Sequence, residues 1–295
     1  MKNKLKHIML LALSTTLIGQ GMQAQQLNTM DAKHEYNPYL SNPSLSGMRE
    51  EKGLITNIHY RRINSNLDGN PLSKALTVDG RMGEGYGAGL QVFNTTAGLI
   101  SETNAKGSFS YHAKMKEGEV LHIGFSMGLT FGRIDMNKVI GQLNDPVLLA
   151  YKSKVLFDSD LGLAYENKGF MLQGTAFNMR RIFKTGLADE VGHDIAYAAI
   201  SNKFDLANGG KIAPRLIYQV RSNTQSVGGF GLGYTAGAMP LSLNAYIHTN
   251  SSYSAGMGYA FSKSFQLNLF YSKPGKDIRG RVGDQMELGM RWAIK

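Results

Sequence analysis

The sequence predicts an all-β fold, a transmembrane up-and-down antiparallel β-barrel of about fourteen strands with a short N-terminal plug or periplasmic segment. Three observations lead to this prediction. The chain begins like an exported bacterial protein. Its apolar residues alternate with a period of two over segments about ten residues long. The connections between these segments alternate between short and long, so we expect a multi-pass protein of a bacterial outer membrane.

The first 24 residues have the features of a secretory signal peptide. Lys2, Lys4 and Lys6 form a basic start, and an apolar stretch follows over residues 8–18. This stretch is too short to cross a bilayer as a helix, which needs about 20 residues. We therefore assign residues 1–24 to a signal peptide that is removed after Ala24.

Residues 25–52 form a separate N-terminal segment that contains two Asn-Pro steps five residues apart. Proline interrupts a continuous helix, and Tyr39, Leu40 and Leu45 make the segment too apolar for a free linker. We interpret it as a structured piece that either plugs the barrel or docks beneath it for a partner protein. A plain linker is the alternative. The candidate plug-forming or partner-binding residues are Tyr36, Asn37, Pro38, Asn42, Pro43 and Gly47.

Residues 53–295 carry the alternating pattern of the barrel. In residues 121–131, Leu121, Ile123, Phe125 and Met127 share one face with other large apolar residues, while small or polar residues occupy the opposite face. Phe270 is an exception to the alternation near the C-terminus. The predicted strands are 53–63, 73–82, 84–94, 100–113, 119–131, 155–166, 169–180, 192–205, 211–223, 225–235, 239–249, 252–262, 264–273 and 283–294.

The connections support an up-and-down barrel, in which tight periplasmic turns alternate with longer outside loops. Every second connection is short, as at 82–84, 167–169 and 208–210. The longest connections, 64–72, 132–154, 181–191 and 274–282, are all odd-numbered, which puts both termini on the periplasmic side. A soluble β-sandwich is the alternative, but its strands are usually about five or six residues long and need no aromatic residues at the strand ends.

Composition narrows the possible functions. The chain has no cysteine, which excludes disulfides and a lipid-anchoring N-terminal cysteine. Its formal charge of +10 falls to +7 without the three lysines of the leader, and the basic residues are spread through predicted turns and loops. Contact with anionic outer-membrane lipid explains this pattern better than nucleic acid, which we do not expect as a partner.

No catalytic sequence motif predicts that the protein is an enzyme. Residues 124–128 match the Gly-x-Ser-x-Gly string of hydrolases, but Ser126 lies inside an alternating strand and not at a strand-to-helix turn. The glycines at 83, 85, 87 and 89 also lie in a strand, where they relieve curvature and let a plug approach the wall. A barrel lipase with Ser126 as nucleophile is a third hypothesis, and we expect no catalytic, cofactor-binding or metal-binding residues.

The histidines of the mature chain show no metal-binding spacing. We expect His112, His122, His193 and His248, which fall in predicted strands, to belong to a polar network in the barrel interior. The other inward positions are mostly Gly, Ser, Thr, Asn and Gln. Such small, neutral residues favour a narrow or filled interior over an ion-selective pore.

Several short motifs resemble the PorP/SprF family of Bacteroidetes outer-membrane proteins. The doubled Asn-Pro stretch NPYLSNPSLSG at 37–47 is the first. Other similar blocks are residues 69–71 with 77–79, GAGLQVFNTTAG at 87–98, SYHAKM at 110–115, residues 121–132, residues 145–146, and DLGLAYENKGFMLQGTAFN at 160–178. The chain departs from the family pattern at Leu45-Ser46, after Arg61-Arg62, and at its C-terminus, which lacks a final Phe.

The resemblance implies a fourteen-stranded barrel that works with the type IX secretion system. It implies partners among the type IX components and a large secreted surface adhesin, with a role in adhesin export or anchoring and in gliding motility. The alternative function is an outer-membrane transporter of hydrophobic small molecules, because such barrels can also have fourteen strands and an N-terminal plug.

Overall fold

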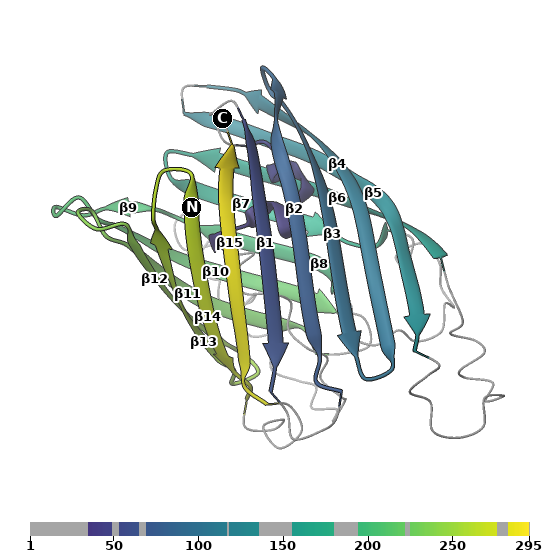
Figure 1. The fold of residues 1–295 in the computed structure, drawn as a ribbon. Coiled ribbons are helices and arrows are strands. Elements are labelled where there is room, and N and C mark those ends of the chain that lie inside the picture. The colour runs from purple at the N-terminus through teal and green to yellow at the C-terminus, as the bar shows by residue number, and fades with distance from the viewer. Residues whose placement is uncertain are drawn as a thin grey trace, which may run out of the picture.

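The chain forms one closed antiparallel β-barrel, seen from the side in Figure 1. The computed structural model describes residues 35–48, 53–64, 69–116, 118–135, 155–179, 194–221, 225–275 and 283–294. Each strand pairs with its neighbours along the chain, and the pairs β15–β1 and β10–β11 close the ring. The fifteen strands make a fourteen-membered ring, because β8 and the two-residue β9 both pair with β10.

The observed strands agree closely with the alternating segments of the sequence, and the prediction of an all-β barrel with about fourteen strands is confirmed. Their bounds are β1 Leu54–Ile63, β2 Leu72–Gly83, β3 Tyr86–Ala97, β4 Ile100–Lys114, β5 Glu119–Ile134, β6 Val155–Asn167, β7 Phe170–Ala176, β8 Asp194–Ser201, β9 Phe204–Asp205, β10 Lys211–Arg221, β11 Val227–Thr235, β12 Leu241–His248, β13 Tyr253–Ala260, β14 Phe265–Lys273 and β15 Gln285–Ile294.

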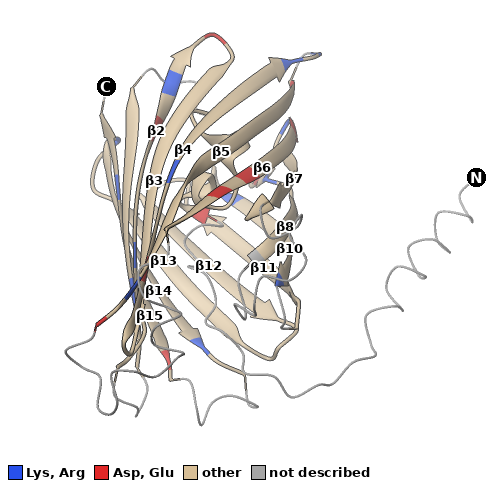
Figure 2. Ribbon diagram, turned by 90° about the vertical axis from the view of Figure 1, so that its right-hand side faces the viewer, with Lys and Arg blue, Asp and Glu red and all other residues tan. Residues whose placement is uncertain are grey.

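The alternation places apolar side chains on the outside of the ring. In β5, Ile123, Phe125 and Met127 are exposed, while His122 and Ser126, at alternate positions of the same strand, are buried inside. Such an apolar outer face suits a strand that contacts lipid. In Figure 2 most of each strand is uncharged, and acidic residues are visible along β6.

Short turns join the strands at one end of the barrel, which we call the short-turn end. Between β6 and β7, Lys168 and Gly169 have φ angles of 48° and 99°, as a tight hairpin turn requires. The turn predicted at 82–84 is centred one residue later, where Gly85 has a φ of 76°. The first residue of β1 and the last residue of β15 also lie at this end.

Two predicted strands differ from the observed ones. The strand predicted at 169–180 ends at Ala176, because Asn178 has a φ of 53° and donates its backbone N–H to Asp160. The strand predicted at 192–205 is interrupted after Ser201. The register of β8 and β9 on β10 places Pro214 opposite this interruption, and proline has no N–H to donate to the ladder.

Several sequence-based predictions lie outside the described residues. These are the signal peptide at 1–24, residues 25–34 of the N-terminal segment, His34 and His193, and most of the long connections at 65–68, 136–154, 180–193 and 276–282.

Within the described ranges, no helix is long and apolar enough to cross a membrane.

Candidate functional site

Residues 35–48, which we call the interior segment, lie inside the ring, where Figure 1 shows them as purple coils. The segment contains two 3₁₀ helices, η1 at Pro38–Leu40 and η2 at Pro43–Leu45. Each begins with proline, whose fixed φ suits the first helical position. The side chain of Asn42 caps η2 by accepting a hydrogen bond from the backbone N–H of Ser44 at 3.0 Å.

Tyr36 attaches the start of the interior segment to two strands, β12 and β14. Its hydroxyl lies 2.7 Å from Asn244 Nδ2, which donates to it, and 2.9 Å from Ser242 Oγ. Its ring packs edge-to-face on Phe270, with centroids 5.6 Å apart. Phe270 is thus an apolar residue at an inward position of β14, and this contact explains why it interrupts the alternation of apolar and polar residues. Burial raises the pKa of Tyr36 to about 12, so its hydroxyl stays neutral at physiological pH.

Glu35 adds a charged contact beside Tyr36. Its Oε1 accepts a hydrogen bond from Tyr246 at 2.6 Å and lies 3.6 Å from Arg215 Nη2. Both partners belong to the wall, on β12 and β10. Arg215 is thus a mostly buried cation with a carboxylate partner.

The two asparagines of the Asn-Pro steps each bind the wall through their amide nitrogen. Asn37 Nδ2 lies 3.0 Å from Thr77 Oγ1 and 3.2 Å from His59 Nε2. Asn42 Nδ2 donates to the backbone carbonyl of Leu163 at 3.1 Å. Both asparagines are almost fully buried, so losing either amide would leave buried wall acceptors without a donor.

Gly47 is the penultimate residue of the interior segment and lies where only glycine fits. Its φ is 61°, and a Cβ on it would lie 2.5 Å from the carbonyl oxygen of Gly80. Its backbone N–H donates to Asp79 Oδ2 at 2.9 Å. The close approach and the hydrogen bond together tie the end of the segment to β2.

Three strand glycines make room for η2 and its neighbours. A Cβ on Gly124 would lie 2.4 Å from Ser44 Cα, one on Gly87 would lie 2.1 Å from Ser46 O, and one on Gly162 would lie 2.0 Å from Asn42 Oδ1. Real Cβ atoms do not approach other atoms so closely. These glycines therefore let the backbone of the segment contact the wall, which is the role expected for strand glycines in a barrel.

Inward residues of β4 contact the segment in a row. Tyr39 donates to Ser108 Oγ at 2.8 Å, and Ser46 Oγ donates to Ser110 Oγ at 2.9 Å. At the next inward position of β4, His112 Nε2 lies 3.0 Å from the carbonyl oxygen of Ser46. Burial also raises the pKa of Tyr39, which keeps its hydroxyl a donor.

A charged group lies further along the barrel interior. The expectation that the inward positions are small and neutral is therefore wrong in this region. Lys106 Nζ lies 2.7 Å from Asp160 Oδ1 and 3.4 Å from Asp158 Oδ2, and all three residues are buried. Ser126 Oγ donates to Asp160 Oδ2 at 2.7 Å. The serine of the Gly-x-Ser-x-Gly string thus has a carboxylate partner and is fully buried.

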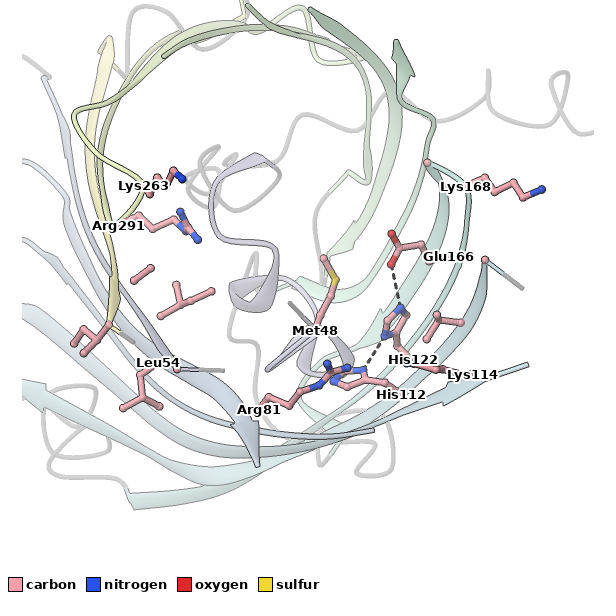
Figure 3. A pocket seen from close by; sticks show the side chains of 17 residues that line it. Met48, Leu54, Arg81, His112, Lys114, His122, Glu166, Lys168, Lys263 and Arg291 are labelled. Carbon is pink, nitrogen blue, oxygen red and sulfur yellow. Dashed lines mark hydrogen bonds and ion pairs between the residues drawn. The ribbon is translucent and has the colours of Figure 1, made fainter. Parts of the chain in front are cut away.

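A cavity of about 720 Å³ opens at the short-turn end, next to Met48 of the interior segment (Figure 3). Its wall contains a histidine pair in which His112 Nδ1 and His122 Nδ1 lie 2.8 Å apart. The other nitrogen of His122 lies 3.4 Å from Glu166 Oε2. The pair therefore belongs to a polar network that joins β4, β5 and β6 to the interior segment.

Among the described residues, no group of three or more metal-ligating side chains lies close enough to hold a metal ion. His112 and His122 contact the polar interior, and His59 joins them there by facing Asn37 and, at 3.9 Å, Glu287.

The candidate residues Tyr36, Asn37, Pro38, Asn42, Pro43 and Gly47 all lie on the interior segment, and most of them contact the wall directly. The partners of these residues on the barrel wall were not predicted from the sequence. Phe270 could have been recognised as an inward contact residue, because it interrupts the alternation of apolar and polar residues. Lys106 and Asp160 could also have been recognised, because each is a charged residue at an inward position of an alternating strand.

Comparison with solved structures shows the same fold. The chain is similar to the CymD monoaromatic hydrocarbon channel, with 13% identity, a TM-score of 0.54 and coverage of 92% of this chain and 94% of that one. It is also similar to the P. putida toluene transporter TodX, with 11% identity, a TM-score of 0.50 and coverage of 88% and 94%. The Acinetobacter baumannii outer membrane protein Omp33 matches with 7% identity, a TM-score of 0.50 and coverage of 83% and 99%.

No curated protein sequence matches the chain. The family described as type IX secretion system membrane protein PorP/SprF matches residues 23–290, which confirms the resemblance found in the sequence. Fold and family are those of a secretion-system membrane barrel and not of an enzyme, and they locate the chain in the outer membrane as a multi-pass protein associated with secretion components. The chain therefore belongs to the PorP/SprF family of type IX secretion system membrane proteins.

Proposed function

We propose that this outer-membrane component of the type IX system is a scaffold that binds partner proteins and so supports the export or surface anchoring of a large adhesin, with a role in gliding motility. In this proposal residues 1–24 direct export and are removed. The short-turn end faces the periplasm, as in other bacterial barrels. The interior segment acts as a plug that braces the barrel.

The observation that carries the proposal is the attachment of the interior segment to many strands. Its side chains and backbone make hydrogen bonds to β1, β2, β4, β6, β7 and β12. A segment held on so many sides stiffens the ring and occupies its interior. A rigid, filled barrel suits protein binding better than solute flow.

Transport of hydrophobic small molecules is the alternative function. Two proteins of similar fold are named as a monoaromatic hydrocarbon channel and a toluene transporter. At identities of 13% and 11%, however, the similarity shows only a shared fold. An apolar solute needs an apolar site. The buried interior described here is lined mainly by Ser, Thr, Asn, Gln, His and charged residues, which favours the scaffold.

The test is a gentle detergent purification of the tagged protein from its native outer membrane, followed by mass spectrometry. Recovery of type IX components or one very large secreted adhesin would support the scaffold. Recovery of the barrel alone with an apolar small molecule would support transport. A Gly124→Ala variant, in which the segment is expected to loosen, should recover less partner than the matched Gly132→Ala variant, whose added Cβ meets no atom within 4 Å.

A further inference from the structure

The cavity at the short-turn end has cations on several of its walls. Arg81 comes from β2, Arg291 from β15, and Lys263 from the turn between β13 and β14. Figure 3 shows Arg291 and Lys263 extending from one wall and Arg81 from another, toward the space beside Met48. These residues are far apart in the sequence, and the closure of the ring brings them to one space.

The positive charge of this cavity is not balanced within the described part of the chain. There, Arg81, Lys263 and Arg291 form no ion pair, and the buried Nε atoms of both arginines have no hydrogen-bond acceptor. Glu166 is the one carboxylate among the described lining residues, and it faces His122.

Two other cations of the interior each have a carboxylate partner, although Arg215 Nε, like the Nε atoms of Arg81 and Arg291, has no hydrogen-bond acceptor. Lys106 lies 2.7 Å from Asp160, and Arg215 lies 3.6 Å from Glu35. A buried guanidinium nitrogen without an acceptor is unfavourable, and a bound carboxylate would supply the acceptor in a planar, bidentate arrangement. The cavity is therefore suited to an anionic ligand.

The shape of the cavity favours a peptide over a lipid. Continuous pairing of β15, β1 and β2 separates it from the surrounding bilayer, so access is through the short-turn end. Its lining also includes the apolar side chains of Met48 and Val120, and its volume of about 720 Å³ is within the usual range of ligand sites, about 300–1,000 Å³. An extended peptide with acidic and apolar residues matches this lining.

We propose that the cavity binds an acidic peptide segment of a periplasmic partner protein, with Arg81 and Arg291 holding its carboxylates. The proposal rests on the partner-binding function proposed above and adds the chemistry of the bound segment. Lys263 contributes to the attraction from the rim.

The test measures binding of a fluorescein-labelled peptide of alternating Glu and Leu residues to the purified full-length protein in an uncharged detergent. The same peptide with Gln in place of Glu serves as the neutral probe. The double variant Arg81→Gln, Arg291→Gln should weaken binding of the acidic peptide at least about tenfold, because each lost contact is charge-assisted. It should leave the neutral peptide unaffected.

The matched control is Lys116→Gln with Lys211→Gln, which removes the same charge near the same end. Lys116 is an exposed turn residue, and Lys211 is exposed and pairs with Asp205 at 3.2 Å. This control should bind within about twofold of the wild type, because neither lysine lines the 720 Å³ cavity. The shift of the folded band on an unheated gel verifies that each variant is folded.

Absence of acidic-peptide binding, equal binding of the neutral peptide, or equal weakening by both double variants would overturn the proposal. Anionic lipid that co-purifies with the wild type and is lost from the Arg81, Arg291 variant, with peptide affinity unchanged, would assign the cavity to lipid instead. Because this assay needs no other secretion component, its failure is distinct from failure of the partner purification that tests the scaffold.

Discussion

Replacing Gly124 by alanine tests whether the barrel wall holds the interior segment by direct backbone contact. Gly124 lies on β5, which pairs with β4 and β6 on either side. The added Cβ would lie 2.4 Å from Ser44 Cα and 2.5 Å from Ser44 N. Ordinary contacts between carbon atoms are about 3.5–4.0 Å, so about 1 Å of movement is needed. The strand is held on both sides, and we expect the interior segment to move.

The expected cost follows from this displacement. Inserting one methyl group into a well-packed interior costs about 1–3 kcal/mol. Since about 1.4 kcal/mol corresponds to a factor of ten, the fraction of molecules with a released segment should rise about 5- to 150-fold. The barrel itself should keep its unfolding temperature, because the strand hydrogen bonds do not change.

Limited proteolysis with chymotrypsin measures the release. Tyr36 and Tyr39 are cleavage sites that are buried in the barrel, so cutting requires the segment to leave its position. When release and return are fast, the cutting rate follows the population of the open form. Gly132→Ala, in the same strand, is the control. Equal cutting rates in the two variants would refute the idea that the wall glycines hold the segment.

Three further predictions concern the same contacts. Asn42→Ala should increase chymotrypsin cleavage of the segment by about tenfold, since it leaves buried wall acceptors without their donor, and an unchanged rate would contradict this role. Lys106→Met should lower the unfolding temperature of the barrel, because losing the cation beside Asp160 costs about 3–5 kcal/mol, and adding Asp160→Asn should recover part of the loss. Between pH 10 and 12 a released Tyr36 ionises more readily than the buried one, whose pKa is about 12, so the released fraction, measured with a protease that is active at alkaline pH, should rise with pH in this window and rise less in Tyr36→Phe.

Local pattern was sufficient to predict the barrel wall. The period of two in residues such as Ile123, Phe125 and Met127 determines which face of a strand is apolar, whatever the strand pairs with. Turn residues such as Lys168-Gly169 carry their own conformational preference. Strand ends were less predictable where a partner strand or side chain interrupted the ladder, as Pro214 and Asp160 do.

Of the candidate site, only the interior segment was predicted from the sequence, and its partners on the barrel wall were not. The Asn-Pro steps identified the interior segment, because proline and asparagine restrict the backbone locally. Their wall partners, such as Thr77 for Asn37 and Gln173 for Asn42, lie 40 and 131 residues away. Contacts at such separations depend on how the ring closes, which no local pattern encodes.

The sequence by itself determined an exported, cysteine-free chain with alternating strands, short turns at one end and a structured segment before the first strand, because each of these features is local. Only the tertiary structure decided that residues 35–48 lie inside the ring and that Phe270 turns inward to Tyr36. It alone placed Lys106 between two aspartates and Arg81 and Arg291 on one cavity. The reason is that inward side chains meet across the ring, where their neighbours are set by strand order and closure and not by spacing along the chain.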